Sequence, residues 1–143
     1  MLYLNLLLLF IQCGAANTGI TKNQLINITI YDKGNINALN ITSEQQQTAI
    51  EVCRQLIEKK EKVRLFLKMG ELDKMLTTEE GIMLSLNEHE SIDKILTFKT
   101  GRLKATEAGS IYIFIKYKNI DIFSDTPFKV LGGTKLLKSI DDF

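Results

Sequence analysis

The segment at residues 111–117, IYIFIKY, constrains the fold more than any other part of the chain, because both of its faces are apolar in a strand. Successive side chains of a strand point to opposite sides. One side carries Ile111, Ile113 and Ile115, and the other carries Tyr112 and Phe114. Such a strand belongs in the centre of a sheet that is covered on both faces. We expect a helix on one face, and the C-terminal segment or a partner on the other.

That helix is predicted at residues 42–62, TSEQQQTAIEVCRQLIEKKEK. Thr42 or Ser43 is suited to cap it, because a glutamine follows each of them three residues later, as in a capping box. Apolar residues recur at three- and four-residue spacing and form one face: Ala49, Ile50, Cys53, Leu56 and Ile57. We expect the charged run at residues 58–62, EKKEK, to be a solvated helix end.

Strand-like runs fill most of the remaining chain. They are QLINITIYDK (24–33), INALNI (36–41), VRLFLK (63–68), IMLSLNEH (82–89), SIDKILTFK (91–99) and IDIFSD (120–125). One short helical turn is expected at residues 72–76, and Gly132-Gly133-Thr134-Lys135 is interpreted as a turn before a terminal helix at 137–142. The order predicts an α+β fold, with one long helix in the N-terminal half packed on an antiparallel sheet of about five to six strands.

Composition limits the classes of partner. The chain has 143 residues, 24% of them charged and 45% hydrophobic, and a net charge of +1. These fractions are typical of a globular protein, and a near-neutral chain lacks the basic excess that nucleic-acid binding requires, so we expect no nucleic-acid partner. Of the two cysteines, Cys53 falls in the apolar face of the predicted helix, where we expect a buried thiol rather than a nucleophile. We also expect no cofactor.

The N-terminus carries a different signal. Residues 2–11 are apolar except for Asn5, and this run is far shorter than the roughly 20 residues of a membrane-spanning helix. The small residues Gly14, Ala15 and Ala16 follow almost at once. A short apolar run followed by small residues is typical of a secretory signal.

Residues 9–14, LFIQCG, resemble the aliphatic box that closes the signal of bacterial lipoproteins, with Cys13 at the lipidated position. The resemblance implies a signal segment at 1–12, a lipidated Cys13 with a flexible tether at 13–23, and a single α+β domain at 24–143. It also implies attachment to a membrane through Cys13, in the bacterial cell envelope, on the periplasmic or the surface side.

Two other interpretations of the N-terminus stay open. The apolar run could be a buried strand or helix, with Cys13 as a small core residue. It could also be a signal cut after Ala15 or Ala16 that releases a soluble secreted protein. The glycosylation acceptor triplets at residues 27–29 and 40–42 are consistent with that second interpretation.

For function, the sequence favours protein binding without catalysis, as in an inhibitor or immunity protein. The candidate binding face combines aromatic and lysine side chains of the central strand: Tyr112, Lys116, Tyr117 and Lys118. Exposed faces and edges of sheets are common sites of protein recognition. The partner is not identified by any motif.

Two rival functions remain. A small exported enzyme could use His89 with Glu88 and Glu90, or with Asp121 and Asp125. His89 is the sole histidine, so no common zinc set can be completed and no metal site is expected. Its position between two glutamates predicts a solvent-facing turn. The other rival is a structural subunit of an envelope complex.

Overall fold

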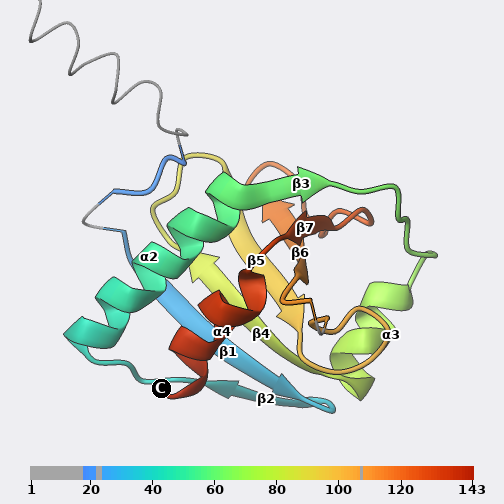
Figure 1. Cartoon of the computed structure of the whole chain (residues 1–143), viewed down its shortest axis with the longest axis horizontal. Helices are drawn as coiled ribbons and strands as arrows, with labels where there is room; N and C mark the ends of the chain where they lie inside the picture. Colours follow the sequence, from blue (N-terminus) through green and yellow to red (C-terminus); the bar gives the residue numbers. More distant parts are fainter. Residues whose placement is uncertain (1–17, 22–23, 107) are drawn as a thin grey trace, which may run out of the picture.

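A computed structural model describes residues 18–21, 24–106 and 108–143, which form a mixed α/β fold (Figure 1). Seven strands form one antiparallel sheet in the order β2-β1-β4-β5-β6-β7-β3. They are β1 (Ile26–Asp32), β2 (Asn35–Ala38), β3 (Lys60–Lys62), β4 (Glu80–Leu86), β5 (Ile92–Phe98), β6 (Ile111–Tyr117) and β7 (Phe128–Val130). The helices among these residues are α2 (Ser43–Lys59), α3 (Glu71–Thr78) and α4 (Gly133–Asp141).

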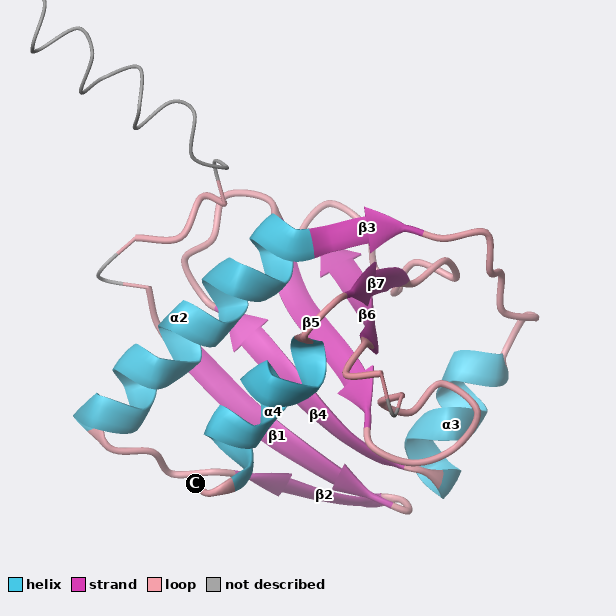
Figure 2. Ribbon diagram, in the orientation of Figure 1, coloured by secondary structure: helices cyan, strands magenta, loops and turns pink. Residues whose placement is uncertain are grey.

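Helices α2 and α4 cover the same face of the sheet (Figure 2). The main core between them and the sheet consists chiefly of Ala49, Ile50, Cys53, Leu56, Leu137 and Ile140 from the helices, and Ile26, Ile28, Ile82, Leu84, Ile95, Ile111, Ile113 and Ile115 from the strands. This arrangement confirms the α+β prediction, and β6 lies inside the sheet, between β5 and β7, while β5 is the middle strand. In the described part of the chain, no helix has both the length and the apolar composition needed to cross a bilayer.

The opposite face of the sheet has a second, smaller core. Phe98 and Phe114 pack edge to face there, with ring centroids 6.1 Å apart. Met75 of α3, and Leu67 and Leu103 from loops, complete its buried residues together with Met83 and Leu96. The prediction that the C-terminal segment covers this face is therefore wrong. The cover comes from α3 and the loops, while the C-terminal helix joins α2.

The start of α2 follows the predicted capping box. The Thr42 side chain accepts a hydrogen bond from the Gln45 backbone at 3.2 Å, and the Gln45 side chain accepts one from the Thr42 backbone at 2.9 Å. The end differs from the prediction. The helix stops at Lys59, and the rest of the charged run forms β3, which pairs with β7 at the edge of the sheet.

Two predicted strands are wrong, and the sheet is larger than predicted. In residues 63–68 the side chains alternate in direction, because Leu65 and Leu67 pack on the second core while Phe66 faces solvent. This segment is nevertheless not paired with any strand. Residues 120–125 form a loop. The extra strands are β3 and β7, each three residues long and too short to show a period. The short turn expected at residues 72–76 is part of α3, which has eight residues.

Candidate binding site

A cleft lies at the C-terminal end of β6. Its volume is about 300 Å³, and it is lined by Tyr117, Ile120, Ile122, Phe123, Ser124 and Asp125. We call it the β6-end cleft. Four of these six side chains are aromatic or aliphatic, so its walls suit an apolar side chain more than a charged one.

The pairing of β6 explains how this cleft forms. On its β6 side, strand β7 reaches only residues 111–113, so the second half of that edge of β6 has no strand partner. The chain after β6 turns back, with the Ile120 N–H donating to the Tyr117 carbonyl at 3.2 Å. The Ser124 N–H then donates to the carbonyl of Ile115 at 3.2 Å. The loop is thus held along β6 by backbone bonds.

Large apolar side chains are unusually exposed around this cleft. Ile122 is 73% exposed and Ile120 is 51% exposed. Phe66, which is 70% exposed, is next to Leu67, whose N–H donates to the Asp125 carbonyl at 3.0 Å. That bond places the two loops side by side. A single exposed aliphatic residue is ordinary, whereas several on adjoining loops are typical of an interaction surface.

The structure separates the four residues of the predicted binding face. Tyr117 lines the cleft, and the exposed Lys118 follows it, with its N–H donating to the Ser91 carbonyl at 2.8 Å. Tyr112 packs against the second core. Lys116 is mostly buried and donates to Asp93 Oδ2 at 2.9 Å. Because side chains alternate along β6, Tyr112 and Lys116 lie on the face opposite Tyr117.

Sequence reasoning missed Ile120 and Ile122 as site residues, because it assigned them to a strand. A signal was available: an apolar run begins only two residues after a complete strand, with Lys118 and Asn119 between. The predicted lipidation site, Cys13, lies outside the described residues.

His89 is buried, and the expectation of a solvent-facing side chain is wrong. The residue is 4% exposed. Nδ1 accepts backbone hydrogen bonds from Ser91 at 3.1 Å and from Ile92 at 2.8 Å, and Nε2 donates to the Thr18 carbonyl at 2.7 Å. Nδ1 faces two N–H groups and acts as their acceptor, while Nε2 faces a carbonyl and acts as a donor. Both nitrogens are engaged, so the ring offers neither a base nor a ligand in this conformation.

The carboxylates proposed to assist His89 do not converge on it. Glu88 and Glu90 are exposed on the turn, and Asp121 and Asp125 are exposed on the loop after β6. Within the residues that the structure describes, no three histidine, cysteine or acidic side chains are grouped closely enough to hold a metal ion.

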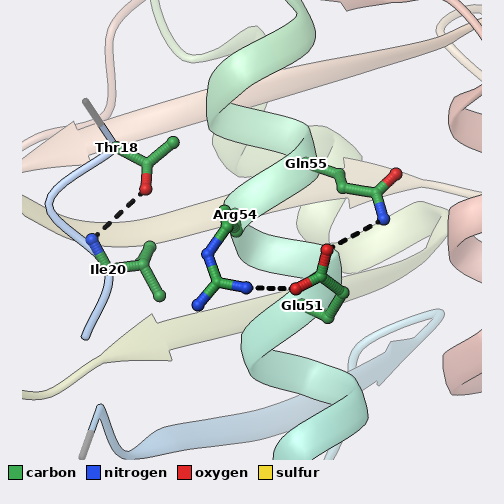
Figure 3. A network of polar contacts seen from close by, with 5 residues as sticks. All are labelled: Thr18, Ile20, Glu51, Arg54 and Gln55. Atoms are coloured by element: carbon green, nitrogen blue, oxygen red, sulfur yellow. Dashed lines mark hydrogen bonds and ion pairs between the residues drawn. The ribbon is translucent and has the colours of Figure 1, made fainter. Parts of the chain in front are cut away.

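Residues 18–20, which were expected to belong to the flexible tether, pack against the fold. Thr18 is buried, and Ile20 contacts the main core. The Ile20 N–H donates to Thr18 Oγ1 at 3.3 Å, as Figure 3 shows together with the contacts of Glu51 on α2. Gly19 has a φ of +72°, and a Cβ there would lie 2.7 Å from His89 Nε2. The chain therefore passes directly over the imidazole, at a position suited to glycine.

Cys53 behaves as the sequence predicts. It is fully buried on α2, and burial raises the pKa of its thiol from 9.0 to about 12. Because the thiolate is the reactive form, this cysteine is inert in the folded protein.

Comparisons of the chain with protein-family models, with curated proteins and with solved structures found no significant match.

Proposed function

We propose that this chain is a small lipid-anchored protein of the bacterial cell envelope that binds another protein, in the manner of an inhibitor or immunity protein. The observation that supports binding is the β6-end cleft with its exposed Ile120, Ile122 and neighbouring Phe66. The observation that supports anchoring is the lipobox-like sequence that ends at Cys13.

The position of Thr18 supports a link between anchor and cleft. The Thr18 carbonyl accepts a hydrogen bond from His89. Two residues after His89, the Ser91 carbonyl accepts one from the N–H of Lys118, which follows the cleft residue Tyr117. Figure 1 shows these segments at the same end of the sheet. Five residue steps separate Cys13 from Thr18, and at about 3.5 Å per residue they span at most about 18 Å. A lipid on Cys13 would hold the cleft near the bilayer, so we expect a membrane-associated partner.

The chemistry of the cleft indicates what such a partner presents. An apolar side chain would enter between Tyr117 and the isoleucines, and burying Ile122 in return would contribute about 1.5–3 kcal/mol. Asp125 lines the cleft, and the exposed Asp121 stands between the lining residues Ile120 and Ile122 in the sequence. Their carboxylates favour a basic residue beside the apolar one. We therefore expect the partner to present an apolar anchor next to lysine or arginine.

The first prediction concerns anchoring. Expressed in a bacterial host, the mature protein should have an intact mass that corresponds to a chain starting at Cys13 and carrying acyl groups. A single acyl chain binds membranes only marginally, so we expect more than one. The variant Cys13→Ala should lack the added mass. A wild-type protein that keeps Met1 and no acyl group would refute the anchoring part of the proposal.

The second prediction concerns the cleft. Ile122→Asp places a charge in the middle of the apolar wall, so the protein should lose its partner while keeping its free energy of unfolding within about 0.5 kcal/mol. The measurement is capture from solubilised membranes of the source cells, with quantitative mass spectrometry of the bound proteins.

The matched control for this capture is Leu131→Asp. Leu131 is also exposed, but it lies beside the end of β7 that pairs with the start of β6, away from the cleft. We expect a protein that is enriched by the wild type and by Leu131→Asp, and absent with Ile122→Asp. If all three baits retain the same proteins in the same amounts, the cleft is not the binding site.

A further inference from the structure

The outer edge of β2 is open. Strand β2 pairs only with β1, with Asn37 opposite Ile30, and the Leu39 N–H donates to the Ile28 carbonyl at 2.9 Å. Because hydrogen-bonded and non-hydrogen-bonded positions alternate in an antiparallel pair, the backbone groups of Asn37 also point to β1. The N–H and C=O groups of Ile36 and Ala38 then point outward. They have no hydrogen bond in the described part of the chain.

This four-residue edge lacks the charge and proline that usually protect a sheet edge. All four residues of β2 are exposed, including Ile36 at 66%. Residues 34–41 contain no charge and no proline. The opposite edge is different: β3 has only three residues, and all of them are charged. Charge is a common means of preventing edge pairing, so β2 is the less protected of the two edges.

We propose that β2 is an interface at which two copies of this chain pair their sheets antiparallel. The four outward groups complement those of a second copy about a twofold axis through Asn37. In that register Ile36 pairs with Ala38 of the second copy, and Ala38 pairs with its Ile36. Each pair exchanges two backbone hydrogen bonds, which leaves none of the four groups open.

The side chains and charges also fit a second copy. Asn37 would face its own equivalent, and two amides can hydrogen bond to each other. Since residues 34–41 are uncharged and the whole chain has a net charge of +1, little electrostatic repulsion opposes self-association. An extended segment of another protein could use the same edge, but it would not be limited to the register that the twofold axis imposes.

Cysteine cross-linking tests this register. The two Asn37 residues would form a non-hydrogen-bonded pair with Cα atoms about 4.5 Å apart, within the range that a disulfide spans. In the full chain carrying Cys13→Ser, the variant Asn37→Cys should form a covalent dimer on mild oxidation. Asn35→Cys is the matched control, because its two copies would lie four residues apart along the strands, about 13 Å. Equal cross-linking at both positions would overturn the proposal.

A charge exchange gives an independent readout. In sedimentation velocity, the wild type should show a dimer at high protein concentration. Asn37→Lys and Asn37→Asp place like charges directly opposite each other, so each variant alone should be monomeric. An equal mixture of the two should recover the dimer. The proposal is overturned if the wild type is monomeric throughout, if either single variant still dimerises, or if the mixture stays monomeric while circular dichroism shows that both variants are folded.

Discussion

Replacing His89 with alanine should lower the free energy of unfolding by about 3 kcal/mol or more. The imidazole is the hydrogen-bond partner of three backbone groups, the N–H groups of Ser91 and Ile92 and the carbonyl of Thr18. A buried backbone group left without a partner costs about 1–3 kcal/mol, and the lost ring also leaves a cavity. Urea denaturation followed by circular dichroism measures the difference. Glu90→Ala, on the same turn but exposed, should change stability by less than about 0.5 kcal/mol.

A double mutant separates the role of the ring from a general defect of the turn. Gly19→Ala should be strongly destabilising in the wild type, because the new Cβ would lie 2.7 Å from His89 Nε2 and the φ of +72° disfavours alanine. In the His89→Ala background only the backbone cost of about 1–2 kcal/mol should remain. If the changes in the free energy of unfolding were additive in the double variant, Gly19 and the imidazole would not be in direct contact, and that contact would not hold the N-terminal segment in place.

His89 also shows why burial can escape sequence analysis. Its neighbours Glu88 and Glu90 are exposed, as their charge predicts, but the ring turns inward to a carbonyl 71 residues earlier in the chain. No local pattern contains that partner. Residues 18–20 are misjudged for the same reason, since their polar composition predicts a tether while the buried Thr18 and His89 satisfy each other.

The sequence predicts well those elements that are long enough to show a clear apolar pattern or that have a local cap. Helix α2 has both a six-residue buried apolar face and a reciprocal Thr42–Gln45 cap, and β6 is a run of apolar residues on both faces that charge interrupts only at Lys116. Strands β3 and β7 have three residues each, and their pairing depends on contacts distant in sequence. Residues 63–68 alternate as a strand would, because any extended segment lying on a core buries every second side chain.

The residues of the candidate site were also predicted only in part, for the same reason. Tyr117 and Lys118 are found because the end of a strand rich in aromatic residues is visible in sequence. Ile122 is missed because alternation around it predicts a strand, and only the short β7 explains why the edge of β6 is left for a loop. The position at which a neighbouring strand ends determines which apolar residues stay exposed. That position depends on the whole sheet and not on the local sequence.

The other large effect is expected at Gly133, where alanine should lower the free energy of unfolding by about 3 kcal/mol. Gly133 is buried at the first turn of α4, directly against the buried Ile111 of β6. A Cβ there would lie 2.8 Å from Ile111 Cδ1 and closer still to Cγ1. The helix cannot easily move away, because the Thr134 N–H donates to the Gly109 carbonyl at 3.0 Å. Urea denaturation of the variant measures the loss.

Gly132 supplies the matched control for this prediction. It has a φ of +73° but nothing within 4 Å of an added Cβ, so Gly132→Ala should cost only the backbone term of about 1–2 kcal/mol. At Gly133 the limit is instead the space beside Ile111. Ile111→Ala should therefore recover part of the free energy of unfolding that Gly133→Ala loses. The double variant should be more stable than the sum of the two single effects predicts. Equal losses at both glycines, with no coupling to Ile111, would mean that α4 packs farther from β6 than the structure places it.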